Sequence, residues 1–194
     1  MTDLNKLIQE TVRKGLMSGG QYGRIVEILQ QKCPCKLLVF GLGNDSYLWN
    51  RINEKGKSYF IEDNEEWIKK FNGLNIIHYD YKTQIKDWKE LMQKEEELMM
   101  KELPNNILSE DWDVIIVDGP VGHPHPCIRK QRKGCNLCPC PGRMQSIYTA
   151  SQLCKKGTII VDDYGRDVER EYSNEFICAN AQIVENKLAI FNLN

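Results

Sequence analysis

The chain has 194 residues, of which 41% are hydrophobic and 27% are charged, a composition typical of one globular domain with a sizeable core. Its 26 basic and 27 acidic residues leave a formal net charge of -1, which excludes a uniformly basic surface and predicts no nucleic-acid partner. No apolar stretch is long enough to span a bilayer, and residues 1–6 lack the apolar core of a secretory signal. We therefore expect a cytoplasmic or otherwise intracellular soluble protein without a membrane anchor.

The order of the predicted elements indicates an α/β fold. Helical spacing over residues 4–29, with a break at Gly19 and Gly20, predicts one or two leading helices. Strands are expected at 36–41, 57–62, 74–79, 112–118 and 157–163. Helices are expected at 45–54, 65–71, 143–154 and 168–178, and a helix or helix pair at 83–102. Two final runs, 181–185 and 188–191, predict a closing hairpin. We expect an N-terminal helical extension over 1–35 and, over 36–194, one domain with a mainly parallel sheet.

The first predicted strand ends in a glycine turn, Phe40-Gly-Leu-Gly-Asn-Asp-Ser46. Glycines allow the backbone to approach a ligand closely, and Asp45 or Ser46 can cap the helix that follows. A turn of this kind commonly holds a nucleotide-like cofactor, although it can also be only a tight connection. We expect Gly41, Gly43, Asp45 and Ser46 to surround a cofactor.

Acidic residues follow the predicted strands, at the edge of the sheet where α/β proteins bind their ligands. These residues are Glu62, Asp80, Asp118, Asp162 and Asp163. Any one of them could be only a helix cap or a turn former. Several at one edge predict a binding site, and Glu62, after the second strand, is placed to accept hydrogen bonds from a ribose.

Several blocks in a fixed order carry a family resemblance. They are residues 40–46 with Trp49, 60–63 with Trp67, 112–120, 141–144 with Ile147 and Tyr148, and Asp163 with Val168, Glu169 and Phe176. Together they resemble the glucuronoxylan 4-O-methyltransferase family, from about residue 36 to the end. The resemblance implies a Rossmann-like, class I methyltransferase with a terminal antiparallel hairpin. Its S-adenosylmethionine would donate a methyl group to a sugar hydroxyl of a glycan or activated sugar.

The chain departs from the plant pattern at several positions. Asn44 stands where the plant pattern has histidine, and Asp162-Asp163 stands where it has His-Asp. An insertion at 121–140, rich in cysteine, histidine and basic residues, lies where the choice of acceptor would be set. In plant members the acceptor is glucuronic acid on xylan, and here it could be another sugar, such as a deoxy or amino sugar.

The proposed chemistry requires a group that helps the acceptor hydroxyl to lose its proton. Carboxylates suit a hard cation such as magnesium or manganese, which could assist this step. We expect Asp118, Asp162 and Asp163 to converge on the hydroxyl, either as metal ligands or with one as the base, and Asp118 also to contact the cofactor. Arg143 is a third catalytic candidate beside Asp118 and Asp163, because its planar fork can bind a carboxylate or hydroxyls of the sugar. It could equally tie down the preceding loop.

The insertion contains a cysteine cluster that could bind structural zinc. Its members are Cys127, Cys135, Cys138 and Cys140. Cys138 and Cys140 are closely spaced for two ligands of one ion, and other residues could substitute for one of them. These substitutes are Cys33, Cys35, His123 and His125. Disulfides and free thiols are the alternatives.

Two other functions fit parts of the sequence. A nicotinamide-dependent oxidoreductase would share the glycine turn, but Ser46 stands where a third glycine is expected. A non-catalytic scaffold could use the cysteine-rich insertion to bind a partner. Trp49 and Trp67 are expected to pack in the core or between helices.

Overall fold

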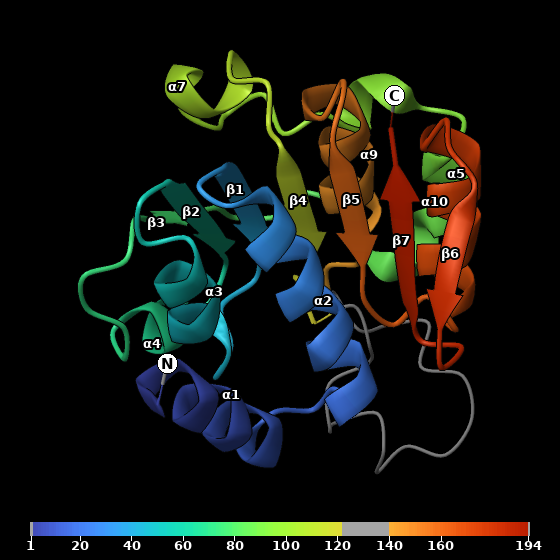
Figure 1. Ribbon diagram of the computed structural model, residues 1–194. Helices are drawn as coiled ribbons and strands as arrows, with labels where there is room; N and C mark the ends of the chain where they lie inside the picture. Colours follow the sequence, from blue (N-terminus) through green and yellow to red (C-terminus); the bar gives the residue numbers. More distant parts are fainter. Residues whose placement is uncertain (1, 122–139, 194) are drawn as a thin grey trace, which may run out of the picture.

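A seven-stranded sheet with the order β3-β2-β1-β4-β5-β7-β6 forms the middle of the structure, a computed structural model that describes residues 2–121 and 140–193 (Figure 1). The strands are β1 (Lys36–Phe40), β2 (Lys57–Glu62), β3 (Ile76–His78), β4 (Val114–Val117), β5 (Thr158–Val161), β6 (Ala181–Val184) and β7 (Leu188–Asn192). The first five are parallel, and β7 runs antiparallel between β5 and β6. The predicted parallel sheet and closing hairpin are confirmed.

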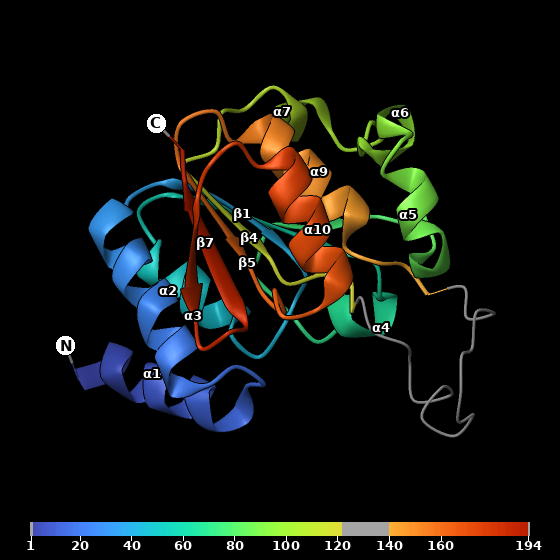
Figure 2. The ribbon, with the colours of Figure 1, turned by 90° about the vertical axis from the view of Figure 1, so that its right-hand side faces the viewer.

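Helices cover both faces of this sheet, as Figure 2 shows. On one face lie α1 (Thr2–Lys14), α2 (Gly19–Lys32) and α3 (Ser46–Ile52). On the other lie α5 (Trp88–Leu91), α6 (Glu95–Leu98), α9 (Met144–Leu153) and α10 (Asp167–Phe176). The short connections also contain α4 (Glu65–Ile68), the 3-10 helix η1 (Ile85–Asp87) and α7 (Asn105–Leu108).

Burial on both faces explains why the central strands are continuous apolar runs. Leu37 and Val39 of β1 belong to the core that α2 and α3 cover. Leu38 and Phe40 belong to the opposite core, which α9 and α10 cover. The sheet is therefore anchored on both sides, and its carboxyl edge is a stable platform for a site.

Two leading helices are present, but the break between them lies before Gly19 and Gly20, where it was predicted. Helix α1 ends at Lys14, and Gly19 and Gly20 begin α2. Ser18 caps α2, because its side chain accepts a hydrogen bond from the Gln21 amide while the Gln21 side chain accepts one from the Ser18 amide. The sequence contained this capping box, and it explains why the glycines start a helix.

The segment 83–102, predicted as one helix or a helix pair, is divided further. Three short pieces, η1, α5 and α6, occupy this segment. Its backbone bonds to side chains of α9 instead of continuing one helix: the Met100 amide donates to Thr149 Oγ1 at 3.1 Å, and Gln145 Nε2 donates to the Glu97 carbonyl at 3.1 Å. Tertiary packing overrides helix propensity here.

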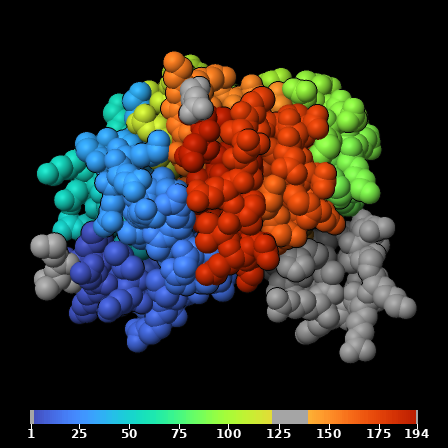
Figure 3. Space-filling model, turned by 45° about the vertical axis from the view of Figure 1, so that its right-hand side comes forward, coloured from blue at the N-terminus to red at the C-terminus, as the bar shows by residue number. Residues whose placement is uncertain are grey.

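The leading helical segment and the closing hairpin lie side by side, as the blue and red surfaces of Figure 3 show. The Ser18 hydroxyl donates to the Glu185 carboxylate, and Arg24 Nη2 donates to Gln182 Oε1 at 3.1 Å. Helix α2 thus packs on the sheet and on the hairpin. The division into a helical extension over 1–35 and a domain over 36–194 stays a prediction. Within 2–121 and 140–193, no helix has the length and apolarity needed to cross a membrane.

Candidate functional site

A cavity of about 700 Å³ opens at the carboxyl ends of the parallel strands. It is lined by the α1–α2 connection, the start of α2, the glycine turn, and the residues that follow β2, β4 and β5. Cys140 and Pro141 border it from the far end of the insertion. The structure therefore brings the glycine turn and four of the predicted acidic residues to one place, with Asp80 outside the lining.

The floor of this cavity is a backbone contact between two glycines. Gly41 has φ +107°, and a Cβ there would lie 3.0 Å from the carbonyl carbon and oxygen of Asp118. A Cβ on Gly119 would lie 2.6 Å from the Gly41 Cα. Both residues must be glycine for β1 and β4 to end this close together. The Gly43 amide donates to Ser46 Oγ at 2.9 Å, which fixes the turn.

Replacing Gly41 by alanine is expected to lower the free energy of unfolding by roughly 2–5 kcal/mol, because it combines a disfavoured backbone conformation with a backbone clash. Chemical denaturation measures the change. Gly23→Ala is the control: Gly23 lies within α2 with nothing inside 4 Å of an added Cβ, so that variant should be as stable as the wild type or slightly more stable. Equal stability of the two variants would contradict this account of the turn.

Asp45 is a buried acid in the wall of the cavity. The sequence predicts that Asp45 or Ser46 caps the next helix; Asp45 occupies the N-cap position of α3, but its side chain makes no capping hydrogen bond to this fully described helix. Its Oδ2 instead accepts a hydrogen bond from the Tyr22 hydroxyl at 3.3 Å. Burial raises the pKa of Asp45 to about 6. The carboxylate is therefore poised to gain from a positively charged ligand.

Helix α2 contributes two residues that sequence reasoning missed. Tyr22 donates to Asp45, and Gln21 Nε2 donates to Asp162 Oδ1 at 3.2 Å. Both residues line the cavity. A polar glutamine between apolar positions of a buried helix face was the available signal for this role.

Glu62 braces the loops that follow β1 and β2. Its Oε2 accepts from the Leu42 amide at 2.8 Å, and its Oε1 accepts from the Asn64 amide at 2.9 Å. Each oxygen keeps a second lone pair for a ligand hydroxyl. Burial raises the pKa of Glu62.

Trp67 also lines the cavity, and its indole N–H donates to the Leu42 carbonyl, so it is more than a packing residue. Trp49 is buried in the core as expected.

Asp118, Asp162 and Asp163 meet at the opposite side of the cavity, and we call these three residues the aspartate edge. One carboxylate oxygen of each lies within 4.8 Å of the others, a donor set that suits a hard divalent cation. Burial raises the pKa of Asp118 well above its ordinary value, although the charge of Arg143 opposes the effect. Burial and the charge of Asp163 raise the pKa of Asp162. The edge therefore favours a nearby positive charge.

Arg143 is the buried cation of this edge, at 3% exposure of its side chain. Its Nη2 lies 3.1 Å from Asp118 Oδ1 and 2.9 Å from Asp163 Oδ2. Its Nη1 donates to the Asp162 carbonyl at 2.8 Å, and its Nε donates to the Pro120 carbonyl at 3.0 Å. Arg143 thus ties the ends of β4 and β5 to the start of α9.

Asp163 has a left-handed backbone with φ 58°, an uncommon conformation for a residue other than glycine. Its Oδ2 is held by Arg143 and also by Arg166 Nη2, at 2.8 Å. Non-glycine residues in this conformation often mark functional positions, where the surrounding structure enforces the geometry. The side chain remains 27% exposed toward the cavity.

The charge of the described cavity lining is unbalanced. It contains three basic side chains, Arg143, Arg166 and Lys187, against six carboxylates. The carboxylates are Asp45, Glu62, Asp63, Asp118, Asp162 and Asp163. Such a lining favours a ligand that carries a positive charge and opposes a dinucleotide, whose pyrophosphate is doubly negative.

The cysteine cluster falls largely outside the described residues, which include Cys140 but not Cys127, Cys135, Cys138, His123 or His125. Cys33 and Cys35 precede β1 at the amino edge of the sheet, with their Sγ atoms 3.7 Å apart. Cys140 lines the cavity at the opposite, carboxyl edge. The zinc site stays a prediction.

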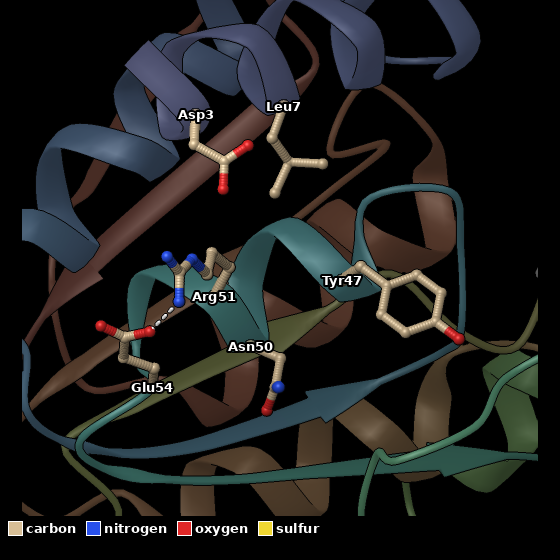
Figure 4. A pocket seen from close by; sticks show the side chains of 6 residues that line it. All are labelled: Asp3, Leu7, Tyr47, Asn50, Arg51 and Glu54. Carbon is tan, nitrogen blue, oxygen red and sulfur yellow. Dashed lines mark hydrogen bonds and ion pairs between the residues drawn. The ribbon is translucent and has the colours of Figure 1, made fainter. Parts of the chain in front are cut away.

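A second, more open hollow of about 430 Å³ lies between α1 and α3. Figure 4 shows Asp3 and Leu7 facing Tyr47, Asn50 and the paired Arg51 and Glu54. None of the predicted site residues lines this hollow. The cavity at the carboxyl edge is the candidate site.

Comparison with known proteins places most of the chain in one family. The family model described as IRX15/IRX15L/GXM matches residues 21–97 and 93–191. Glucuronoxylan 4-O-methyltransferase 2 of Arabidopsis thaliana is 34% identical over 192 residues, covering 86% of this chain and 62% of that protein. Arabinogalactan O-methyltransferase 2 of the same plant is 28% identical, covering 81% and 60%. The chain spans between 54% and 62% of the length of the curated relatives it matches.

A solved structure shares the fold. The MycE methyltransferase of mycinamycin biosynthesis, in complex with Mg and SAH, superposes with a TM-score of 0.53 at 10% identity, covering 98% of this chain and 54% of MycE. The observed topology is that of class I methyltransferases, so the predicted fold is confirmed.

Proposed function

Because the chain belongs to the IRX15/IRX15L/GXM family and has the class I methyltransferase fold, we propose that it transfers a methyl group from S-adenosylmethionine to a sugar hydroxyl. The observation that carries this proposal is the carboxylate-rich cavity at the carboxyl edge of the sheet. S-adenosylmethionine would supply an activated methyl group on a positively charged sulfur. A cavity with six carboxylates among its described lining residues suits this charge.

The cavity has residues suited to each part of this cofactor. The glycine turn presents bare backbone at Gly41 and Gly43, where a side chain would fill the space or strain the turn. Glu62 would accept hydrogen bonds from the ribose, since it lines the cavity and each carboxylate oxygen carries two lone pairs. Asp45 would compensate the positive charge of the methionine end. These residues therefore fit the group.

The aspartate edge would act on the acceptor. Asp118 and Asp163 are half-buried and reach the cavity, so either could take the proton of a bound hydroxyl. Alternatively, Asp118, Asp162 and Asp163 would hold a magnesium or manganese ion that lowers the pKa of this hydroxyl. The donors of Arg143 are occupied by protein groups, so we assign it the positioning of the edge and not the binding of the sugar.

The acceptor is proposed to be a sugar unit of a glycan or an activated sugar. Matched relatives are named for glucuronoxylan and for arabinogalactan, which indicates that the family includes more than one glycan acceptor. The insertion at 121–140 begins and ends at the cavity, beside Val121 and Cys140, so it is placed to influence the choice. A deoxy or amino sugar remains among the acceptors to be tested.

Transfer of a labelled methyl group tests this function. The protein and methyl-labelled S-adenosylmethionine are incubated with one acceptor at a time: glucuronoxylan, arabinogalactan or a nucleotide sugar from a panel. Each reaction is run with untreated protein, with chelator-treated protein, and with manganese added after chelation. We expect label in a sugar ether, which survives mild base. Label that mild base releases would show methylation of a carboxylate, and no label in any acceptor would contradict the proposal.

Asp45→Asn is expected to stabilise the free protein while weakening cofactor binding. The rise of the Asp45 pKa from 3.8 to about 6 corresponds to roughly 3 kcal/mol. Folded Asp45 holds its proton more tightly than unfolded Asp45, so stability is lost as pH rises from about 4 through about 6. The asparagine avoids this loss. Its free energy of unfolding should exceed that of the wild type by up to about 3 kcal/mol at neutral pH, and the two should agree below about pH 4.

Denaturation across this pH range and calorimetry with S-adenosylmethionine measure the two effects. Removing a buried charge that faces the ligand should weaken binding about 10- to 100-fold. Asp80→Asn is the control, because the Asp80 side chain is 75% exposed and lies outside the cavity lining. A destabilised Asp45→Asn that binds the cofactor normally would contradict the assignment.

A further inference from the structure

Glu169 is a buried acid whose role the proposed chemistry does not yet include. It lies in the first turn of α10 at 1% exposure, and neither carboxylate oxygen has a hydrogen-bond partner on another residue that the structure describes. Buried polar groups are nearly always hydrogen-bonded, so a buried carboxylate in this state needs an explanation.

Two arginines lie just beyond hydrogen-bond distance of this carboxylate. Glu169 Oε1 is 3.9 Å from Arg143 Nε and 3.6 Å from Arg166 Nη1. Both arginines instead hold Asp163, at 2.9 and 2.8 Å, and Arg143 also holds Asp118 at 3.1 Å. The two guanidinium groups therefore lie between Asp118 and Asp163 on one side and Glu169 on the other. Among these carboxylates they are within hydrogen-bond distance of Asp118 and Asp163 but not of Glu169.

The bonded set is the aspartate edge, which is also the donor set for a divalent cation. A cation there would compete with Arg143 Nη2 for the carboxylates of Asp118 and Asp163. Two positive charges on the same carboxylates repel strongly in a buried site. A shift of about 1 Å would bring Arg166 Nη1 within hydrogen-bond distance of Glu169, and would do the same for Arg143 Nε once its N–H leaves the Pro120 carbonyl.

We propose that Glu169 is a positioning residue, the carboxylate to which Arg143 and Arg166 turn when Asp118 and Asp163 take up a divalent cation. Glu169 keeps the guanidinium groups paired after they leave the aspartate edge, so the cation enters without leaving a buried arginine uncompensated. This inference rests on the proposed function, of which the divalent cation is one form.

Manganese binding tests this role without an acceptor, because free aqueous Mn²⁺ has a strong paramagnetic resonance signal that bound ion lacks. The full chain is titrated with Mn²⁺, and the Asp118→Asn/Asp163→Asn double variant provides the background. We expect Glu169→Gln to weaken Mn²⁺ binding at least tenfold and to change S-adenosylmethionine affinity less than threefold. Ser173→Ala is the matched control, since Ser173 is fully buried, lies one turn along α10 and has an unpartnered hydroxyl among the described residues. Its Mn²⁺ affinity should stay within twofold of the wild type.

A second variant predicts the opposite sign and keeps Glu169 itself unchanged. Arg166→Gln removes one of the two guanidinium groups on Asp163 and should strengthen Mn²⁺ binding at least threefold. A change of less than twofold in both Glu169→Gln and Arg166→Gln would overturn the proposal. So would a wild-type chain that binds S-adenosylmethionine but takes up no Mn²⁺ above background. Failure to bind S-adenosylmethionine would instead overturn the proposed function.

Discussion

Asp163→Asn is expected to lower the rate of methyl transfer at least about 100-fold while S-adenosylmethionine affinity stays within about threefold of the wild type. A positioned base or a metal-activated hydroxyl contributes about 10² to 10⁴ to a rate. Asp163 supplies a partly exposed carboxylate at the aspartate edge, across the cavity from the glycine turn and Glu62. The loss should therefore fall on turnover and not on cofactor binding.

The substitution preserves the conformation of the turn, since asparagine tolerates the left-handed backbone that Asp163 adopts. Asp167→Asn is the control, because the Asp167 side chain is 73% exposed at the start of α10, and its rate should stay within twofold of the wild type. Initial rates with labelled S-adenosylmethionine and calorimetry separate the two effects. A tenfold or smaller loss of turnover with intact cofactor binding would contradict the role of Asp163.

Arg143→Met is expected to lower the free energy of unfolding by about 3–5 kcal/mol, the usual cost of removing one partner of a buried ion pair. The guanidinium neutralises Asp118 and Asp163 and donates to the carbonyls of Pro120 and Asp162. Methionine fills much of the volume but leaves these groups unpaired. Urea denaturation at neutral pH measures the change.

Arg170→Met is the control, because Arg170 pairs with Asp167 at the surface of α10, and its free energy of unfolding should stay close to that of the wild type. The free energy of unfolding of Arg143→Lys should lie between those of Arg143→Met and the wild type, since a lysine keeps the charge but not the planar fork. If Arg143→Met lost less than about 1 kcal/mol, Arg143 would not organise the aspartate edge.

Local patterns were sufficient to predict much of the fold. The apolar runs of β1, β4 and β5 are continuous because both faces of these strands are covered, and that pattern distinguishes a parallel sheet from a half-exposed one. Parallel strands align their carboxyl ends, so the acids after β4 and β5 could be expected to meet. Asp118, Asp162 and Asp163 do so.

Residues that act through long-range contacts were not predictable in the same way. Gln21 reaches Asp162 across 141 positions of the chain, and no local pattern reports that approach. The sequence left two roles for Arg143, binding the sugar or holding the preceding loop. Only the structure, in which its N–H groups donate to the carbonyls of Pro120 and Asp162, favours the second role. Glu169 lies near the start of a predicted helix, and no local pattern reports that the packing of α10 buries it beside Arg143.

Calorimetric titration of the chelator-treated protein with S-adenosylmethionine and with NAD tests the central claim most directly, because the two ligands carry opposite charges at the groups that would enter the cavity. The carboxylate-rich lining predicts micromolar binding of S-adenosylmethionine and no binding of NAD. Binding of NAD alone, or of neither ligand, would contradict a methyltransferase site at the carboxyl edge of this sheet.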